Sequence, residues 1–159
     1  MSSTLAVQVS HRFSAAAERV FDAWITPSQA SRFFFATRTG NIMRCQIDAR
    51  VGGHFLVTDR RPQADGEESV MDADHRGEFI EIDRPRRLAF DFSVPQFTDA
   101  ASRVTIEITP LAATACELVL THEMPDSEIA RHYEEQTRTG WQRMLATLER
   151  ELFPKRVGI

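Results

Sequence analysis

The sequence predicts an α+β domain in which a strongly bent, seven-stranded antiparallel sheet wraps around one long C-terminal helix. Three observations lead to this fold. Residues 5–13 alternate apolar and polar side chains and precede two short helical segments. Residues 38–122 contain six further strand-like segments separated by turn signals. Residues 127–152 form an amphipathic segment without internal proline. A bent sheet with a helix across its concave face buries all of these apolar faces.

The N-terminal strand is predicted by Leu5, Val7, Val9 and Phe13, which share one face of a period-two pattern. Apolar residues then recur at helical spacing over residues 15–25. The dipeptide Thr26-Pro27 favours the start of a second, short helix that ends in "RFFFA", because proline suits the first helical position.

The six middle strands are predicted from alternation such as "LAFDFSV" and "RVTIEIT", with Asp65-Gly66 as a hairpin turn. Two adjacent glycines, Gly52 and Gly53, interrupt the strand-like stretch "DARVGGHFLV". We interpret them as a turn or bulge that needs positive φ, in preference to the close approach of a ligand to the backbone.

The C-terminal helix is predicted to span roughly seven turns, with Asp126 as its N-cap. Its apolar stripe includes Tyr133, Gly140 and Met144, which we expect to face the sheet. Pro154 prevents continuation of the helix.

Composition excludes several classes of protein. A length of 159 residues indicates one domain, residues 1–159, with its core between 5 and 152. The net charge of −4 and the absence of a basic stripe argue against nucleic acid as a partner. There is no secretion leader and no apolar run long enough for a membrane span, so we expect a cytoplasmic protein in which Cys45 and Cys116 are reduced.

Residues that could carry catalysis show no recognisable arrangement. The five histidines lack metal-ligand spacing, and neither a nucleophile elbow nor a phosphate-cradling glycine loop is present. We therefore predict no catalytic residues, no metal and no cofactor.

Five segments occur in the order and spacing of a known family: "FDAWITPSQASRFF", "DARVGGHF", "HRGEFIEIDRPRRLAFDF", "VTIEITPL" and "GWQRMLATLEREL". Over residues 5–152 the chain resembles the activator-of-heat-shock-protein-90-ATPase homologue-like family of the START/Bet v 1-like (SRPBCC) superfamily. It departs from the family in having Phe33, Phe34 and Phe35 where a tryptophan pair is frequent. The last hairpin, "PLAATACE", also lacks the usual glycines.

The resemblance implies the helix-grip fold, with an apolar cavity between the sheet and the C-terminal helix. Residues whose phase suits the lining of that cavity are Phe34, Met43, Phe55, His75, Phe79, Phe90, Phe92, Ile106, Leu118, Leu120, Tyr133, Gly140, Trp141 and Met144. Among the polar side chains, Tyr133, Trp141, His75 or His122 would orient a ligand through hydrogen bonds.

Three functions stay open at this point. The favoured one is binding of a small hydrophobic or amphipathic molecule in the cavity. The second is a co-chaperone-like interaction module, whose partner would be a chaperone or a second copy of the chain. The third, a cyclase- or hydrolase-type enzyme using the same pocket, ranks lowest because no catalytic constellation is visible.

Overall fold

The computed structural model describes residues 4–37, 39–63, 66–98 and 100–155. Its elements are β1 (Thr4–Phe13), α1 (Ala17–Ile25), α2 (Pro27–Ala30), β2 (Asn41–Ile47), β3 (His54–Gln63), β4 (Gly66–Asp83), β5 (Arg87–Ser93), β6 (Ser102–Ala112), β7 (Ala115–Pro125), α3 (Glu128–His132) and α4 (Glu134–Leu152). From β1 to β7 this is the predicted order of elements. Asp65 of the predicted hairpin turn lies outside the described residues, and β3 and β4 on either side of it pair with each other.

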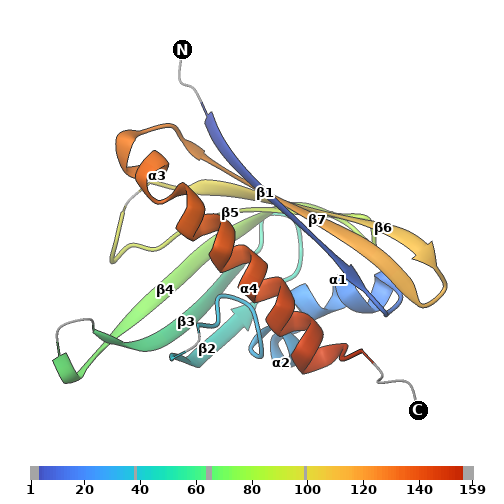
Figure 1. The fold of residues 1–159 in the computed structure, drawn as a ribbon, viewed down its shortest axis with the longest axis horizontal. Helices are drawn as coiled ribbons and strands as arrows, with labels where there is room; N and C mark the ends of the chain where they lie inside the picture. The colour runs from blue at the N-terminus through green and yellow to red at the C-terminus, as the bar shows by residue number, and fades with distance from the viewer. Residues whose placement is uncertain (1–3, 38, 64–65, 99, 156–159) are drawn as a thin grey trace.

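The seven strands form one antiparallel sheet in the order β1-β7-β6-β5-β4-β3-β2. Strands β2 to β7 pair with their sequence neighbours, and β1 pairs with β7, so that Phe13 lies opposite Cys116. The sheet curves around α4, which crosses its concave face, while α1 and α2 lie near one end of that helix (Figure 1). This is the helix-grip fold.

The glycine pair forms the turn between β2 and β3. Gly52 has a φ of +82°, and a Cβ at Gly53 would lie 2.2 Å from the Asp48 carbonyl oxygen. The Gly52 N–H donates to the Phe79 carbonyl at 2.8 Å, and the Phe79 N–H donates to the Gly53 carbonyl at 2.9 Å. The turn interpretation is confirmed, and these bonds tie the turn to β4.

The core lies between the concave face and the helices. It contains Trp24 and Phe33 from the α1–α2 region, sheet residues such as Phe90, and Leu145 and Leu148 of α4, all fully buried. Each large apolar side chain contributes about 1.5–3 kcal/mol on burial. Burial also raises the pKa of the Cys45 and Cys116 thiols to about 11, so both are protonated at neutral pH.

The C-terminal segment contains two helices, which corrects the prediction of one. Ser127 caps α3 by accepting a hydrogen bond from the Ala130 N–H at 3.0 Å, whereas the predicted cap, Asp126, binds the Arg131 guanidinium at 2.6 and 2.7 Å. The chain leaves helical geometry at Tyr133, where φ is −98° and ψ is 9°. Backbone hydrogen bonds from the Tyr133 N–H to the Ile129 carbonyl at 3.1 Å and from the Thr137 N–H to the Tyr133 carbonyl at 2.9 Å connect α3 and α4 across this residue.

Candidate functional site

An aromatic cluster fills the space between the sheet and the middle of α4, and Phe35 lies at its centre. The Phe35 ring stacks on His75 with centroids 4.0 Å apart and planes 12° apart. It also stacks on Phe34 at 4.3 Å and contacts Phe92 at 5.0 Å and Trp141 at 5.8 Å. These five rings are the aromatic cluster. They come from the loop after α2, from β4 and β5, and from α4, so tertiary folding assembles them.

Phe35 holds its position with an unfavourable backbone. Its φ of +57° makes it the one non-glycine residue with positive φ in the described part of the chain. This conformation costs a residue with a Cβ roughly 1–2 kcal/mol, because the Cβ crowds the following carbonyl oxygen. Phe35 is only 6% exposed, so burial of its ring offsets that cost. Strain of this kind concentrates at functional sites.

The segment after Phe35 is fastened to β3 by a buried carboxylate. The Thr37 hydroxyl donates to Asp59 at 3.2 Å, and the Arg61 Nε lies 3.0 Å from the same side chain without hydrogen-bond geometry. Asp59 has no exposed surface, and burial raises its pKa although Arg61 and Thr37 act in the opposite direction. A Cβ at Gly40 would lie 2.3 Å from the Asp59 carboxylate, so the loop passes very close to it.

His75 is a neutral, buried member of the aromatic cluster. Its Nδ1 lies 3.2 Å from the Val57 carbonyl oxygen, which only accepts, so Nδ1 carries the proton. Burial lowers the pKa of His75 to about 4, although the bond to Val57 acts in the opposite direction. At neutral pH, Nε2 therefore presents a lone pair.

His122 joins Trp141 to Ser102 in a hydrogen-bonded chain. The Trp141 indole N–H donates to His122 Nδ1 at 3.0 Å, and His122 Nε2 lies 2.7 Å from the Ser102 Oγ. Burial lowers the pKa of His122 to about 4, so the ring is neutral. Because an indole nitrogen only donates, Nδ1 is the acceptor, and the single ring proton is on Nε2. His122 therefore donates to Ser102.

The direction of these hydrogen bonds determines whether His122 can act as a general base for Ser102. A general base for Ser102 would need a free lone pair on the nitrogen that faces the hydroxyl. That nitrogen carries a proton, and the Trp141 N–H occupies the lone pair on the other nitrogen. The pair is thus set up to orient groups and not to generate a nucleophile.

Most of the predicted lining residues face the core. Eleven of the fourteen are buried in the core cluster or packed against it: Phe34, Phe55, His75, Phe79, Phe90, Phe92, Ile106, Leu118, Leu120, Trp141 and Met144. Their inward orientation follows from the strand alternation and from the phase of α4. Whether they contact a ligand stays a prediction.

Three predicted orientations are wrong. Met43 is 53% exposed because a bulge between Ile42 and Arg44 breaks the alternation of β2. Tyr133 is 48% exposed because it lies at the break between α3 and α4. Gly140 faces outward, and a Cβ built on it would meet nothing within 4 Å. It lines a separate groove of about 630 Å³ between α4 and the segment 31–42.

Two residues of this site escaped the prediction. Ser102 lies two positions before Val104 and shares its inward phase, so strand alternation could have identified it. Phe35 could not be found in this way, because alternation and helical periodicity do not indicate a left-handed residue in a loop.

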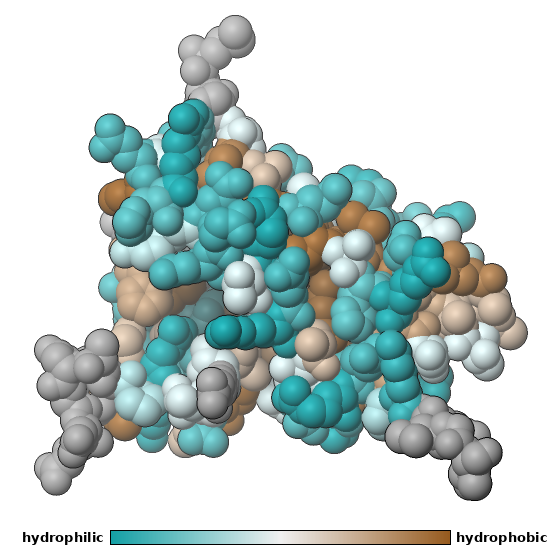
Figure 2. All heavy atoms as spheres, in the orientation of Figure 1, coloured by the Kyte–Doolittle hydropathy of each residue, from teal (hydrophilic) through white to brown (hydrophobic). Residues whose placement is uncertain are grey.

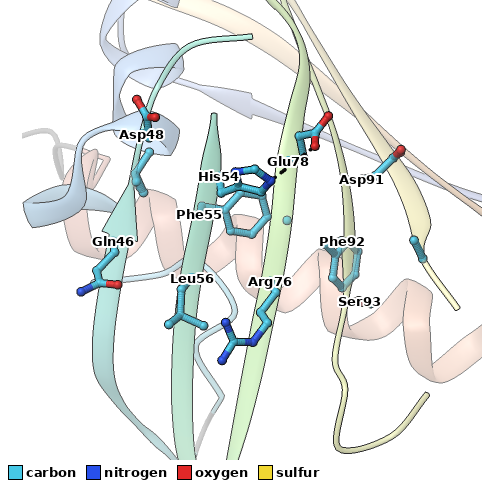
Figure 3. Close-up of a pocket in the computed structure, with 13 residues that line it drawn as sticks. Gln46, Asp48, His54, Phe55, Leu56, Arg76, Glu78, Asp91, Phe92 and Ser93 are labelled. Atoms are coloured by element: carbon cyan, nitrogen blue, oxygen red, sulfur yellow. Dashed lines mark ion pairs between the residues drawn. The ribbon is translucent and has the colours of Figure 1, made fainter. Parts of the chain in front are cut away.

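Another hollow, of about 630 Å³, lies on the convex face of the sheet over β2 to β5 (Figure 3). Its rim is polar and already paired: His54 and Glu78 lie 3.4 Å apart, and Asp91 accepts from Arg103 at 2.8 Å. The rings of Phe55 and Phe92 lie behind the strands, on the side of α4 (Figure 3). The lining of this hollow is mostly apolar, although its rim is polar. The concave side is the better candidate for a site because it gathers the aromatic cluster around the buried, neutral His75.

The surface is also hollowed beside the first half of α4 (Figure 2). Glu134, Thr137 and Arg138 are half-buried on this part of the helix, and Arg138 pairs with Glu134 at 3.3 Å. Farther along the helix, Met144, Leu145 and Leu148 pack tightly on the core.

No group of histidine, cysteine or acidic side chains among the described residues is arranged to hold a metal ion. Within the same part of the chain, no helix is both long and apolar enough to cross a membrane.

Solved structures share this fold. A protein from Chromobacterium violaceum matches with a TM-score of 0.78 at 20% identity, covering 94% of this chain and 99% of that one. An AHSA1-like protein from Aeromonas hydrophila matches with a TM-score of 0.72 at 21% identity, covering 96% of this chain and 100% of that one. An HSP90 activator from Plasmodium falciparum matches with a TM-score of 0.70 at 22% identity, covering 96% of this chain and 99% of that one.

Comparison at the level of sequence gives two results. A search of the curated proteins finds no significant match. Residues 14–152 match the family described as Activator of Hsp90 ATPase homolog 1-like protein, and this span is most of the chain. The chain belongs to the Activator of Hsp90 ATPase homolog 1-like family.

Proposed function

We propose that this protein binds a small hydrophobic or amphipathic molecule between the concave face of the sheet and α4. The observation that carries the proposal is the aromatic cluster, in which a strained Phe35 lies against the buried, neutral His75. Small-molecule sites are mostly apolar and contain a few convergent polar groups, and this cluster with the nearby His122–Ser102 pair has that composition.

The strained residue supports a specific way of binding. Phe35 occupies the space that a ligand would take, and its unfavourable φ lowers the free energy needed to move it. A ligand ring that replaces the Phe35 ring would recover the stacking on His75 and the contact with Trp141. Binding is therefore an exchange of one ring for another.

The two tryptophans provide the test. N-phenyl-1-naphthylamine, an uncharged fluorescent probe, is titrated into the ¹⁵N-labelled protein, and the two indole N–H signals are followed by NMR. We expect the Trp141 signal to shift more than that of Trp24, because the Trp141 ring contacts Phe35 itself at 5.8 Å. The Trp24 ring packs against Phe33 at 4.9 Å and contacts the cluster at Phe34, at 5.4 Å. Absence of binding up to the solubility of the probe, or shifts of Trp24 alone, would refute the proposal. Native mass spectrometry of freshly purified protein then asks which molecule is retained.

A co-chaperone-like role is the second candidate, and family membership together with the fold shared with an HSP90 activator supports it. It predicts that a chaperone of this class shifts backbone NMR signals of the protein. If addition of an HSP90 middle domain leaves the spectrum unchanged, this candidate fails and the ligand-binding proposal is unaffected.

A further inference from the structure

The Trp141–His122–Ser102 chain has a fixed direction. The indole can only donate, which makes His122 Nδ1 an acceptor at 3.0 Å and leaves the ring proton on Nε2. Nε2 then donates to the Ser102 Oγ at 2.7 Å. Each group donates a hydrogen bond to the next in the same direction, and hydrogen bonds aligned in this way strengthen one another.

The end of the chain is an unused donor. Ser102 already accepts the hydrogen from His122, and its own hydroxyl hydrogen makes no hydrogen bond to any other described residue. Ser102 is half-buried at the start of β6, where its backbone pairs with Phe92 of the aromatic cluster. A half-buried hydroxyl with a free hydrogen is available to an acceptor on a bound molecule.

The charge of that acceptor is also limited by its surroundings. His75 and His122 are neutral at pH 7. The half-buried Arg138 is already paired with Glu134 and Glu135. A carboxylate placed here would lose its hydration without gaining a free cation, which is costly. An uncharged oxygen avoids that cost.

We infer that the bound molecule carries an uncharged carbonyl-type oxygen that accepts the hydroxyl hydrogen of Ser102. This inference rests on the proposed function, because it assigns the polar end of the ligand in the same site. The chemical class is an apolar molecule with a ketone, aldehyde or ester group.

Two matched probes test it: 2-acetylnaphthalene, which has the ketone, and 2-ethylnaphthalene, which lacks it. Ser102→Ala should weaken binding of the ketone by about three- to tenfold, the usual range for one hydrogen bond, and change binding of the hydrocarbon less than twofold. Ser102→Thr keeps the hydroxyl and should retain most of the affinity for the ketone. Comparing each probe with itself across variants cancels the difference in hydrophobicity between the probes.

The outcomes separate the two proposals. If the ketone and the hydrocarbon bind but Ser102→Ala affects them equally, the inference is wrong and the proposed function stands. If neither probe binds the unmodified protein, both are wrong. Tighter binding of 2-naphthoate than of the ketone would also overturn the inference.

The direction of the chain can be measured without a ligand. The ¹⁵N shifts of the His122 ring should show a proton on Nε2, and Trp141→Phe, which removes the indole donor, should let the Nδ1-protonated form appear. Ser102→Ala should leave the tautomer unchanged, which also reports that this variant is folded. A ring protonated at Nδ1 in the unmodified protein would contradict the inference at its first step.

Discussion

At the scale of single residues, Phe35 combines two properties that rarely coincide, a left-handed backbone and a buried aromatic ring. The tripeptide Phe33-Phe34-Phe35 indicates burial from composition alone, and all three side chains are buried. Which of the three takes the left-handed conformation depends on contacts with His75 and Trp141, which are remote in sequence. Local patterns therefore predict the chemistry of this residue but not its conformation.

The strain at Phe35 can be measured by comparing glycine with alanine at the same position. Both variants lose the ring, which costs about 3–5 kcal/mol for a buried phenylalanine, but only glycine relieves the backbone. We expect Phe35→Gly to be more stable than Phe35→Ala by about 1 kcal/mol in urea unfolding.

Phe90 is the control for that comparison, because it is fully buried in a regular strand. There the order should reverse, since glycine in a strand interior is less stable than alanine by about 0.5–1 kcal/mol. The same order at both positions would show that Phe35 carries no strain.

At the scale of elements, α4 shows what periodicity can and cannot predict. The segment is an amphipathic helix, as predicted, with Trp141, Met144, Leu145 and Leu148 buried. The predicted phase over its N-terminal end is wrong because the break at Tyr133 restarts the helix. Ile129 and Tyr133, predicted on the apolar stripe, are exposed before and at the break, and no local signal in the sequence marked the break.

Strand alternation predicted the sheet better than periodicity predicted the helix. Side chains of a strand alternate between two faces. Once the face of one residue is known, the faces of its neighbours follow, until a bulge breaks the alternation. Phe90 and Leu118 lie inward as expected, and Met43 lies outward because of the bulge in β2. Bulges are set by sheet curvature, which depends on the whole fold.

Gly140 has no packing role in α4, since a Cβ there meets nothing within 4 Å. Gly140→Ala should stabilise the protein by about 0.5–1 kcal/mol, the difference in helix propensity. Thermal unfolding and urea midpoints measure this. A loss of stability would mean that the groove beside α4 needs the glycine for contacts within the chain.

Gly77 is the matched opposite case. A Cβ there would lie 2.2 Å from the Phe55 ring and 2.6 Å from the Asp91 carbonyl oxygen. Gly77→Ala must therefore displace a buried aromatic ring or backbone, and we expect a loss of about 1–3 kcal/mol, typical of overpacking. A neutral result would show that Phe55 has room to move within the core.

At the scale of the whole molecule, α4 and the sheet enclose two kinds of interior. Leu145 and Leu148 belong to the buried apolar core, whereas Trp141 lies beside the cluster that includes His75 and donates to His122, both of them neutral. Buried polar groups add little to stability even when hydrogen-bonded, because water satisfies them equally well in the unfolded chain. The presence of two buried histidines beside Trp141 therefore supports a site there. It also makes the free energy of unfolding depend on pH.

The two histidines make the protein less stable as the pH falls, over the range between 6.5 and about 4. Burial lowers the pKa of both His75 and His122 from 6.5 to about 4, so between these values the unfolded chain binds more protons than the folded protein. Their contribution is complete above pH 6.5 and is lost as the pH falls toward 4, with a slope of up to about 1.4 kcal/mol per pH unit for each histidine. Carboxylates with lowered pKa, such as Asp22 beside Arg84, contribute to acid unfolding mainly around and below their ordinary value of 3.8.

Urea unfolding at several pH values between 4.5 and 7 therefore measures the two histidines together with Asp59, whose raised pKa gives a contribution of opposite sign. We expect stability to fall across this range, and a variant with both His75→Gln and His122→Gln to show a much flatter profile. His54, whose side chain is 75% exposed, is the control, and His54→Gln should leave the slope unchanged. A flat profile in the unmodified protein would mean that His75 and His122 are hydrated when folded, and the interior beside Trp141 would then be open to water.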